Sequence, residues 1–142
     1  MSRIPIDTLA FQLAVAYHEG QKRWDGKPYI THPIAVATKM ETPDEIAVAY
    51  LHDILEQTLC TTTDLLTAGI PVLLIDKIKL LTHNMNESYE QYINKIRTSK
   101  DRVTIKVKKN DILHNLSTLD KIKHPLLYDK YTKALNILEN NE

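Results

Sequence analysis

Residues 46–53 have the sequence Ile46-Ala47-Val48-Ala49-Tyr50-Leu51-His52-Asp53, an apolar run that ends in an adjacent imidazole and carboxylate. Glu56 follows one helical turn after the histidine. Burial of an imidazole beside a carboxylate is costly unless both groups have a partner. A divalent metal ion suits both groups at once, so the run predicts part of a metal site. The working hypothesis from this segment is a metal-dependent hydrolase.

The same run lies in the helix with the clearest start signal of the sequence. Thr42 is a suitable N-cap, Pro43 stands at the first helical position, and Glu45 is placed to close a capping box. We expect this helix to extend to about Gln57. His52 and a glutamate four residues later should then lie on one face, with the intervening aspartate about 100° around the helix axis.

Helical signals recur along the rest of the chain. Apolar spacing predicts helices over about residues 8–19 and 33–40, with Gly20 as the C-terminal cap of the first. Further helices should start at Thr62 or Thr63, Pro71, Ser88, Asp101 and Pro125. Residues 102–107 could form a strand, but the apolar spacing continues past them and favours a helix. We therefore predict an all-α fold, one domain over residues 1–142 built as a bundle of about seven or eight helices.

Composition narrows the class of protein. The 142 residues suffice for one domain with a real core. The formal net charge is zero, which gives no general attraction to nucleic acid. Cys60 is the single cysteine, which fits a reducing compartment. No segment approaches the ~20 apolar residues of a membrane span. We expect a soluble cytoplasmic protein without nucleic-acid or membrane partners, and the sequence leaves its oligomeric state open.

Basic residues are concentrated between residues 95 and 109. The group comprises Lys95, Arg97, Lys100, Arg102, Lys106, Lys108 and Lys109, interrupted by the acidic Asp101 alone. A run of this kind is usually a solvated face. The alternative is one wall of a pocket for an anionic ligand.

Two further segments carry side chains that could complete a metal site. His32 stands at the start of a predicted helix, and Asp111 lies on a later helix with Asn115 and Thr118 along one stripe. Alone, the doublet at residues 52–53 has an ordinary alternative, a hydrogen-bonded histidine in the core. Together, two imidazoles and two carboxylates suit manganese, iron(II), cobalt or zinc better than calcium or magnesium. Such an ion can generate hydroxide at neutral pH and polarise a phosphoryl oxygen.

Four motifs stand in a fixed order between residues 18 and 119. They are His18-Glu19-Gly20-Gln21-Lys22-Arg23, Gly26-Lys27-Pro28-Tyr29-Ile30-Thr31-His32-Pro33, Leu51-His52-Asp53-Ile54-Leu55-Glu56 and Asp111-Ile112-Leu113-His114-Asn115-Leu116-Ser117-Thr118-Leu119. With them the sequence resembles HD-domain phosphohydrolases of the RelA/SpoT type, most closely the stand-alone small alarmone hydrolases, over about residues 10–119. The resemblance implies a single HD domain. It also implies removal of the 3′-pyrophosphate from guanosine tetra- or pentaphosphate (ppGpp or pppGpp), the nucleotides of the stringent response.

The resemblance also implies roles for individual residues. The metal ligands fall on His32, His52, Asp53 and Asp111, and manganese is the usual ion. The first member of the catalytic acidic pair falls on Glu56. Arg23 is the arginine that stacks on guanine, and Asn115 and Thr118 contact the nucleotide. Apart from the resemblance, Lys22 in the same loop as Arg23 could meet phosphate groups, and the alternative is an ordinary solvated charge.

Two positions depart from the family pattern. Gln57 stands where the second catalytic carboxylate is expected, and an amide can hold a water but cannot act as a base. Trp24 stands where a basic residue is common, and it could stack on a base or cover the pocket. These departures leave two alternatives open. One is hydrolysis of another phosphorylated nucleotide or of a nicotinamide dinucleotide phosphate, and the other is a non-catalytic nucleotide-binding module.

The remaining histidines and tyrosines have plainer interpretations. We predict a structural role for His18, no metal-binding role for His114, and surface positions for His83 and His124. The helically spaced tyrosines are expected to serve in packing; they are Tyr89, Tyr92, Tyr128 and Tyr131.

Overall fold

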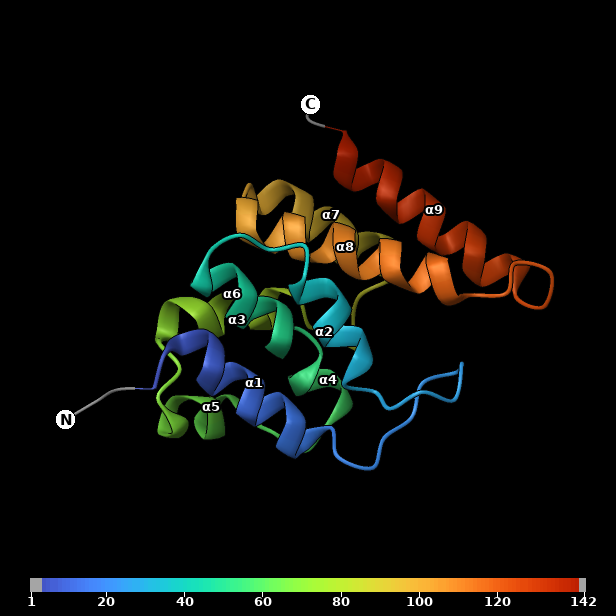
Figure 1. Cartoon of the computed structure of the whole chain (residues 1–142). Coiled ribbons are helices and arrows are strands. Elements are labelled where there is room, and N and C mark those ends of the chain that lie inside the picture. Colours follow the sequence, from blue (N-terminus) through green and yellow to red (C-terminus); the bar gives the residue numbers. More distant parts are fainter. Residues whose placement is uncertain (1–3, 141–142) are drawn as a thin grey trace.

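The computed structural model describes residues 4–140, and within that range its regular structure is helical apart from one isolated β-bridge between Lys22 and Pro28 (Figure 1). The helices are α1 (Ile6–Tyr17), α2 (Thr31–Ala37), α3 (Pro43–Leu51), α4 (Ile54–Gln57), α5 (Thr62–Ala68), α6 (Val72–Leu80), α7 (Tyr89–Ser99), α8 (Arg102–Thr118) and α9 (Pro125–Glu139). The prediction of an all-α fold is confirmed, and residues 102–107 belong to α8. Because α4 is a single turn, the other eight helices of residues 4–140 match the predicted bundle of about seven or eight.

Side-chain caps start several of the helices. Each cap accepts a hydrogen bond from the backbone N–H three residues later, and these residues are Thr42, Thr61, Ser88 and Asp101. Such caps satisfy N–H groups that the first helical turn leaves unpaired. The capping box predicted at Glu45 is wrong in detail, because its carboxylate accepts a hydrogen bond from the N–H of Glu41 at 3.0 Å instead.

A glycine caps the end of α5, whereas the glycine predicted to cap the first helix does not. Gly69 caps α5 with a φ of 110°, a left-handed conformation that glycine adopts without strain. The helix before Gly20 ends earlier than predicted, at Tyr17, and its C-cap is His18.

The helix predicted to extend to Gln57 is interrupted at His52 and Asp53. The Nδ1–H of His52 donates to the carbonyl oxygen of Ala49 at 2.6 Å. In a continuous helix that carbonyl would accept the N–H of Asp53, so the imidazole competes with the backbone for it. Asp53 has φ −104° and ψ 0°, and α4 starts after it. The expectation that His52 and Glu56 share one helical face is therefore wrong.

Helix α3 lies at the centre of the bundle and packs against α1, α2, α6 and α8 (Figure 1). Its residues Ala47, Val48 and Ala49 are completely buried. Helix α8 packs against α2 and α3 on one side and against α7 and α9 on the other. This packing brings the start of α2, the end of α3 and the middle of α8 to one point. No helix in residues 4–140 has both the length and the apolar character needed to span a membrane.

Candidate active site

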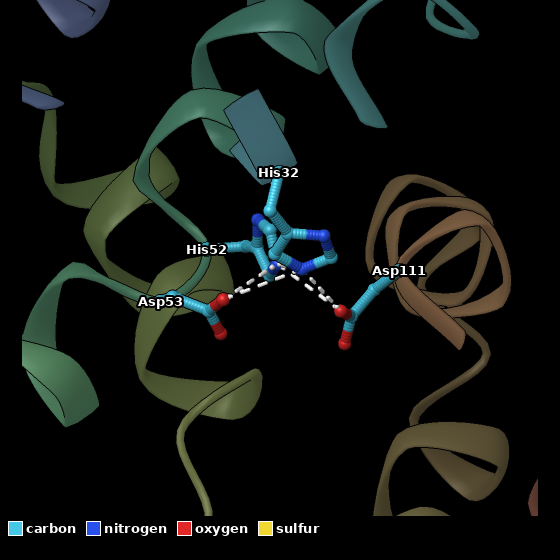
Figure 2. Close-up of side chains that lie close together, drawn as sticks. All are labelled: His32, His52, Asp53 and Asp111. Carbon is cyan, nitrogen blue, oxygen red and sulfur yellow. Dashed lines mark hydrogen bonds and ion pairs between the residues drawn. The ribbon is translucent and has the colours of Figure 1, made fainter. Parts of the chain in front are cut away.

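His32, His52, Asp53 and Asp111 converge where those three helices meet (Figure 2). One ligand atom from each side chain lies within 4.8 Å of all the others. The Nε2 atoms of the two histidines are 3.3 Å apart. Nε2 of His32 lies 2.8 Å from Oδ1 of Asp111, and Nε2 of His52 lies 3.2 Å from Oδ2 of Asp53. Two imidazole nitrogens and two carboxylate oxygens that face a common point fit a divalent transition-metal ion.

Other side chains and the backbone fix the orientation of these four residues. The hydroxyl of Tyr29 donates to Oδ2 of Asp53 at 2.7 Å. The ammonium of Lys108 donates to Oδ2 of Asp111 at 2.8 Å, which leaves Oδ1 toward the histidines. The bond from His52 to the carbonyl of Ala49 turns Nε2 of that ring toward the cluster. Outer hydrogen bonds of this kind orient metal ligands and set the histidine tautomer.

Electrostatics keep both carboxylates of the cluster ionised. Burial alone would raise the pKa of Asp111, but the Lys108 ammonium and the His52 imidazole outweigh it and hold that pKa well below its usual range. Burial opposes ionisation of Asp53 too, and His52 lowers the pKa of that carboxyl. Burial disfavours a charged His52, yet Asp53 and Asp111 raise its pKa. The carboxylates are therefore in the form that binds a cation.

A cleft of about 340 Å³ opens beside the cluster, and His32, Asp53 and Asp111 form part of its lining. The other lining residues are Lys22, Arg23, Trp24, Tyr29, Glu56, Gln57, His83, Tyr89, Tyr92, Lys108, Asn115, Lys130 and Tyr131. A volume of this size suits a small-molecule ligand.

The loop between α1 and α2 supplies one wall of the cleft. Its Arg23 side chain donates to Oδ1 of Asn115 at 2.9 Å and to the hydroxyl of Thr118 at 3.3 Å. The indole N–H of Trp24 donates to the same hydroxyl at 3.2 Å, and the guanidinium carbon of Arg23 lies 5.1 Å from the centre of the indole ring. These four residues, named from the sequence as substrate-binding, thus form one connected group. Lys22 lies beside them in the cleft lining.

The two residues named as catalytic also line the cleft. Oε1 of Glu56 accepts a hydrogen bond from the backbone N–H of His83 at 2.8 Å, which fixes the carboxylate. The carbonyl oxygen of Gln57 accepts one from the side-chain amide of Gln21 at 2.7 Å. Asp53, Glu56 and Gln57 all line the cleft, while His52 is buried and does not.

Several cleft residues were missed or misplaced from the sequence. Lys108 was named only as a member of the basic stretch, although it lies three residues before Asp111 and shares its helical face, a spacing that was a usable signal. Lys130 and Tyr131 come from α9, beyond the four motifs, and the sequence gives no signal for Lys130. Tyr131 was expected only to serve in packing, as were Tyr89 and Tyr92, which also line the cleft. His83, predicted at the surface, is half-buried in the cleft lining, where its ring stacks on Tyr92 with a centroid distance of 4.8 Å.

The remaining predictions for histidines and for the basic stretch have mixed outcomes. His18 is buried, and its Nδ1 lies 2.8 Å from Oε1 of Gln21, as a structural role requires. His114 is outside the four-residue cluster but contacts His32. Burial and the charges of His32 and Arg23 lower the pKa of His114 to about 4.

Of the basic stretch, Lys108 alone lines the cleft within the described part of the chain.

Comparison with known proteins places this geometry in a family. No protein-family model matches the sequence. The GTP pyrophosphokinase of Streptomyces coelicolor is 32% identical over 142 aligned residues, which cover 90% of this chain and 16% of that protein. The bifunctional (p)ppGpp synthase/hydrolase SpoT of Escherichia coli is 33% identical over 130 residues, or 80% of this chain and 18% of that protein. This chain is a homologue of the HD-type RelA/SpoT hydrolases.

A solved structure supports the same assignment of the fold. A metazoan SpoT orthologue, described as hydrolysing ppGpp with a role in starvation responses, matches with a TM-score of 0.80 over 100% of this chain and 90% of that one. The two sequences are 17% identical, so the match concerns the fold. The present chain spans only 16–18% of the length of the two curated relatives named above. The family resemblance seen in the four motifs is confirmed.

Proposed function

We propose that the protein is a metal-dependent pyrophosphohydrolase that removes the 3′-pyrophosphate from ppGpp and pppGpp. The observation that carries this proposal is the cluster of two histidines and two aspartates, three of them buried, at the edge of a cleft lined with cationic side chains. Relatives of similar sequence are named guanosine-3′,5′-bis(diphosphate) 3′-pyrophosphohydrolases. We further propose manganese as the ion and the cytoplasm as the location, in keeping with the single buried cysteine.

The ligands would be His32, His52, Asp53 and Asp111. When bound, a divalent ion would supply Lewis acidity toward the phosphoryl oxygen and lower the pKa of a water. The side chain of Tyr29 keeps Asp53 in place, and Lys108 keeps one oxygen of Asp111 occupied. The protein thereby presents the ligand atoms in a fixed arrangement.

Glu56 would orient the attacking water and accept its proton. Its carboxylate is held by the backbone N–H of His83 and faces the cleft. Gln57 would hold the same water by hydrogen bonding, without taking the proton. A single carboxylate that is fixed in place can act as a general base.

The walls of the cleft would bind the nucleotide. Arg23 and Trp24 present a guanidinium and an indole on which a purine could stack, and Asn115 and Thr118 hold that arginine in place. Lys22 lies on the same wall, and Lys130 on the α9 side of the cleft. Their ammonium groups would neutralise the phosphates that are not cleaved.

The test is release of pyrophosphate from ppGpp by the purified protein with Mn²⁺. Turnover should be lost on chelation and in Asp53→Ala. His124→Ala is a matched control, because His124 is exposed and outside the cleft lining. Absence of turnover in the wild type, or normal turnover in Asp53→Ala, would refute the proposal.

One observation favours a second candidate, another phosphorylated nucleotide or a nicotinamide dinucleotide phosphate as substrate. Gln57 lines the cleft at the position where the family pattern has a carboxylate, and Trp24 replaces a basic residue there. A nucleotide panel, scored separately for phosphate and pyrophosphate release, distinguishes the candidates. Exclusive turnover of the guanosine nucleotides rejects the second, while tight binding without turnover would indicate a binding module.

A further inference from the structure

His32 and His114 face each other across the contact between α2 and α8. Their Nδ1 atoms are 2.7 Å apart. The rings are close to parallel, with an angle of 21° between their planes and 5.0 Å between their centres. At this separation the two nitrogens share one hydrogen bond, so one carries a proton and the other a lone pair.

The position of the other ring nitrogen of His32 decides which residue donates. Nε2 of His32 points into the cluster, 2.8 Å from Oδ1 of Asp111 and 3.3 Å from Nε2 of His52. A histidine binds a metal through an unprotonated nitrogen, so a neutral His32 that binds through Nε2 carries its proton on Nδ1. The Nδ1 of His114 is then the acceptor.

The second histidine of the cluster has the same arrangement with a different partner. The Nδ1–H of His52 donates to the carbonyl oxygen of Ala49 at 2.6 Å, and its Nε2 faces the cluster. Backbone carbonyls and carboxylates are the usual acceptors for a metal-binding histidine. At His32 an imidazole takes that place.

We infer that His114 is a positioning residue of the metal centre, which accepts the Nδ1–H of His32 and holds Nε2 of that ring toward the ion. The inference rests on the metal site of the proposed function. His114 does not line the substrate cleft. It lines a separate hollow between α2 and α8, together with Ala35, Thr38, Lys39, Asn110, Leu113 and Ser117. Its effect therefore passes through His32 and not through contact with substrate.

Two substitutions separate the hydrogen bond from the packing of the ring. His114→Phe keeps an aromatic ring against His32 but removes the acceptor. His114→Asn loses the ring but places an amide oxygen near the position of Nδ1. Calorimetric titration with Zn²⁺ should show affinity about 10–100-fold weaker in His114→Phe, with substantial recovery in His114→Asn. His124→Phe, at an exposed histidine, is the matched control and should bind as the wild type does.

Nuclear magnetic resonance of the zinc-loaded protein gives a readout that does not depend on affinity or activity. The Nδ1–H proton of His32 should exchange slowly with water in the wild type and much faster in His114→Phe. The Nδ1–H of His52, bonded to Ala49, is an internal reference and should stay protected in both. Loss of protection at both histidines would indicate general loosening of the site and would contradict a specific role for His114.

The outcomes also separate this inference from the proposed function. Wild-type affinity in His114→Phe, or an unprotected His32 Nδ1–H in the zinc-loaded wild type, would overturn the role of His114 while leaving hydrolysis intact. Zinc binding that weakens in His114→Phe, without hydrolysis of any nucleotide, would support the role and refute the proposed substrate. A wild type that binds no zinc would overturn both. If His114→Phe does not fold, the wild-type spectrum and His114→Asn still decide.

Discussion

Binding of a divalent metal ion should stabilise the folded protein strongly. The perturbation is removal of metal with a chelator, followed by titration with Mn²⁺, Co²⁺ or Zn²⁺. The ligand atoms come from α2, from the segment between α3 and α4, and from α8, and they lie within 4.8 Å of one another only when these segments pack together. The unfolded chain holds the same side chains far apart, so the ion binds the folded state preferentially.

The size of the effect follows from the metal affinity and the length of the chain. An ion at one hundred times its dissociation constant adds about 2.7 kcal/mol to the free energy of unfolding. A chain of 142 residues has an unfolding entropy of about 0.3 kcal/mol/K, at about 2.1 cal/mol/K per residue. The midpoint of thermal unfolding should therefore rise by about 9 °C.

Differential scanning calorimetry of the chelated and metal-loaded protein measures this shift. His52→Ala removes one ligand and should abolish most of the shift, whatever it does to the midpoint of the metal-free protein. His124→Ala should keep the full shift. A wild-type change below about 2 °C with all three ions would mean that the four side chains form a hydrogen-bonded core cluster and not a metal centre.

Three further predictions concern the cleft and the start of α8. Gln57→Asp should raise the turnover number for ppGpp about 10–100-fold, because it adds a second group able to take a proton; unchanged or lower turnover would show that the amide suits the substrate. Lys108→Met leaves the buried Asp111 without its counter-ion. Urea unfolding of the chelated protein should then show a free energy of unfolding lower by about 3–5 kcal/mol, and a change under about 1 kcal/mol would contradict a stabilising ion pair. Burial favours a neutral Asp101, but Lys77 outweighs it and lowers the pKa of that carboxyl. Its contribution to stability is present above its unfolded pKa of about 3.9 and lost as pH falls through the lower folded pKa, so Asp101→Asn should flatten the acid limb of a stability–pH profile.

Local signals in the sequence were enough to predict most of the fold. Thr42, Ser88 and Asp101 each cap a helix as expected, because a cap depends on a hydrogen bond to an N–H three residues away. The interruption at His52 was not predictable from spacing. It depends on the imidazole taking the carbonyl of Ala49, and apolar periodicity carries no information about that competition.

The residues of the candidate site likewise fall into two groups, those that motifs in the sequence predict and those that depend on how the helices pack. The four ligand positions were named in advance because they lie in motifs with a fixed order, and the structure brings them together. The contact between His32 and His114 joins residues 82 positions apart, and it depends on how α2 packs on α8. Lys130 reaches the cleft because α9 packs on α7 and α8. Sequence spacing reports which residues share a helix face, but not which faces meet.

The charge of the cleft connects the family departure at Gln57 with the expected substrate. The charged side chains of the lining are the cationic Lys22, Arg23, Lys108 and Lys130 and the anionic Asp53, Glu56 and Asp111. A divalent ion would add two positive charges, so the occupied cleft would have an excess of positive charge that suits a substrate with several phosphates. The neutral amide of Gln57 leaves this excess of positive charge larger than the carboxylate of an aspartate would. Gln57→Asp should therefore raise the KM for ppGpp together with the turnover number, whereas a rise in turnover at constant KM would show that residue 57 acts on the water alone.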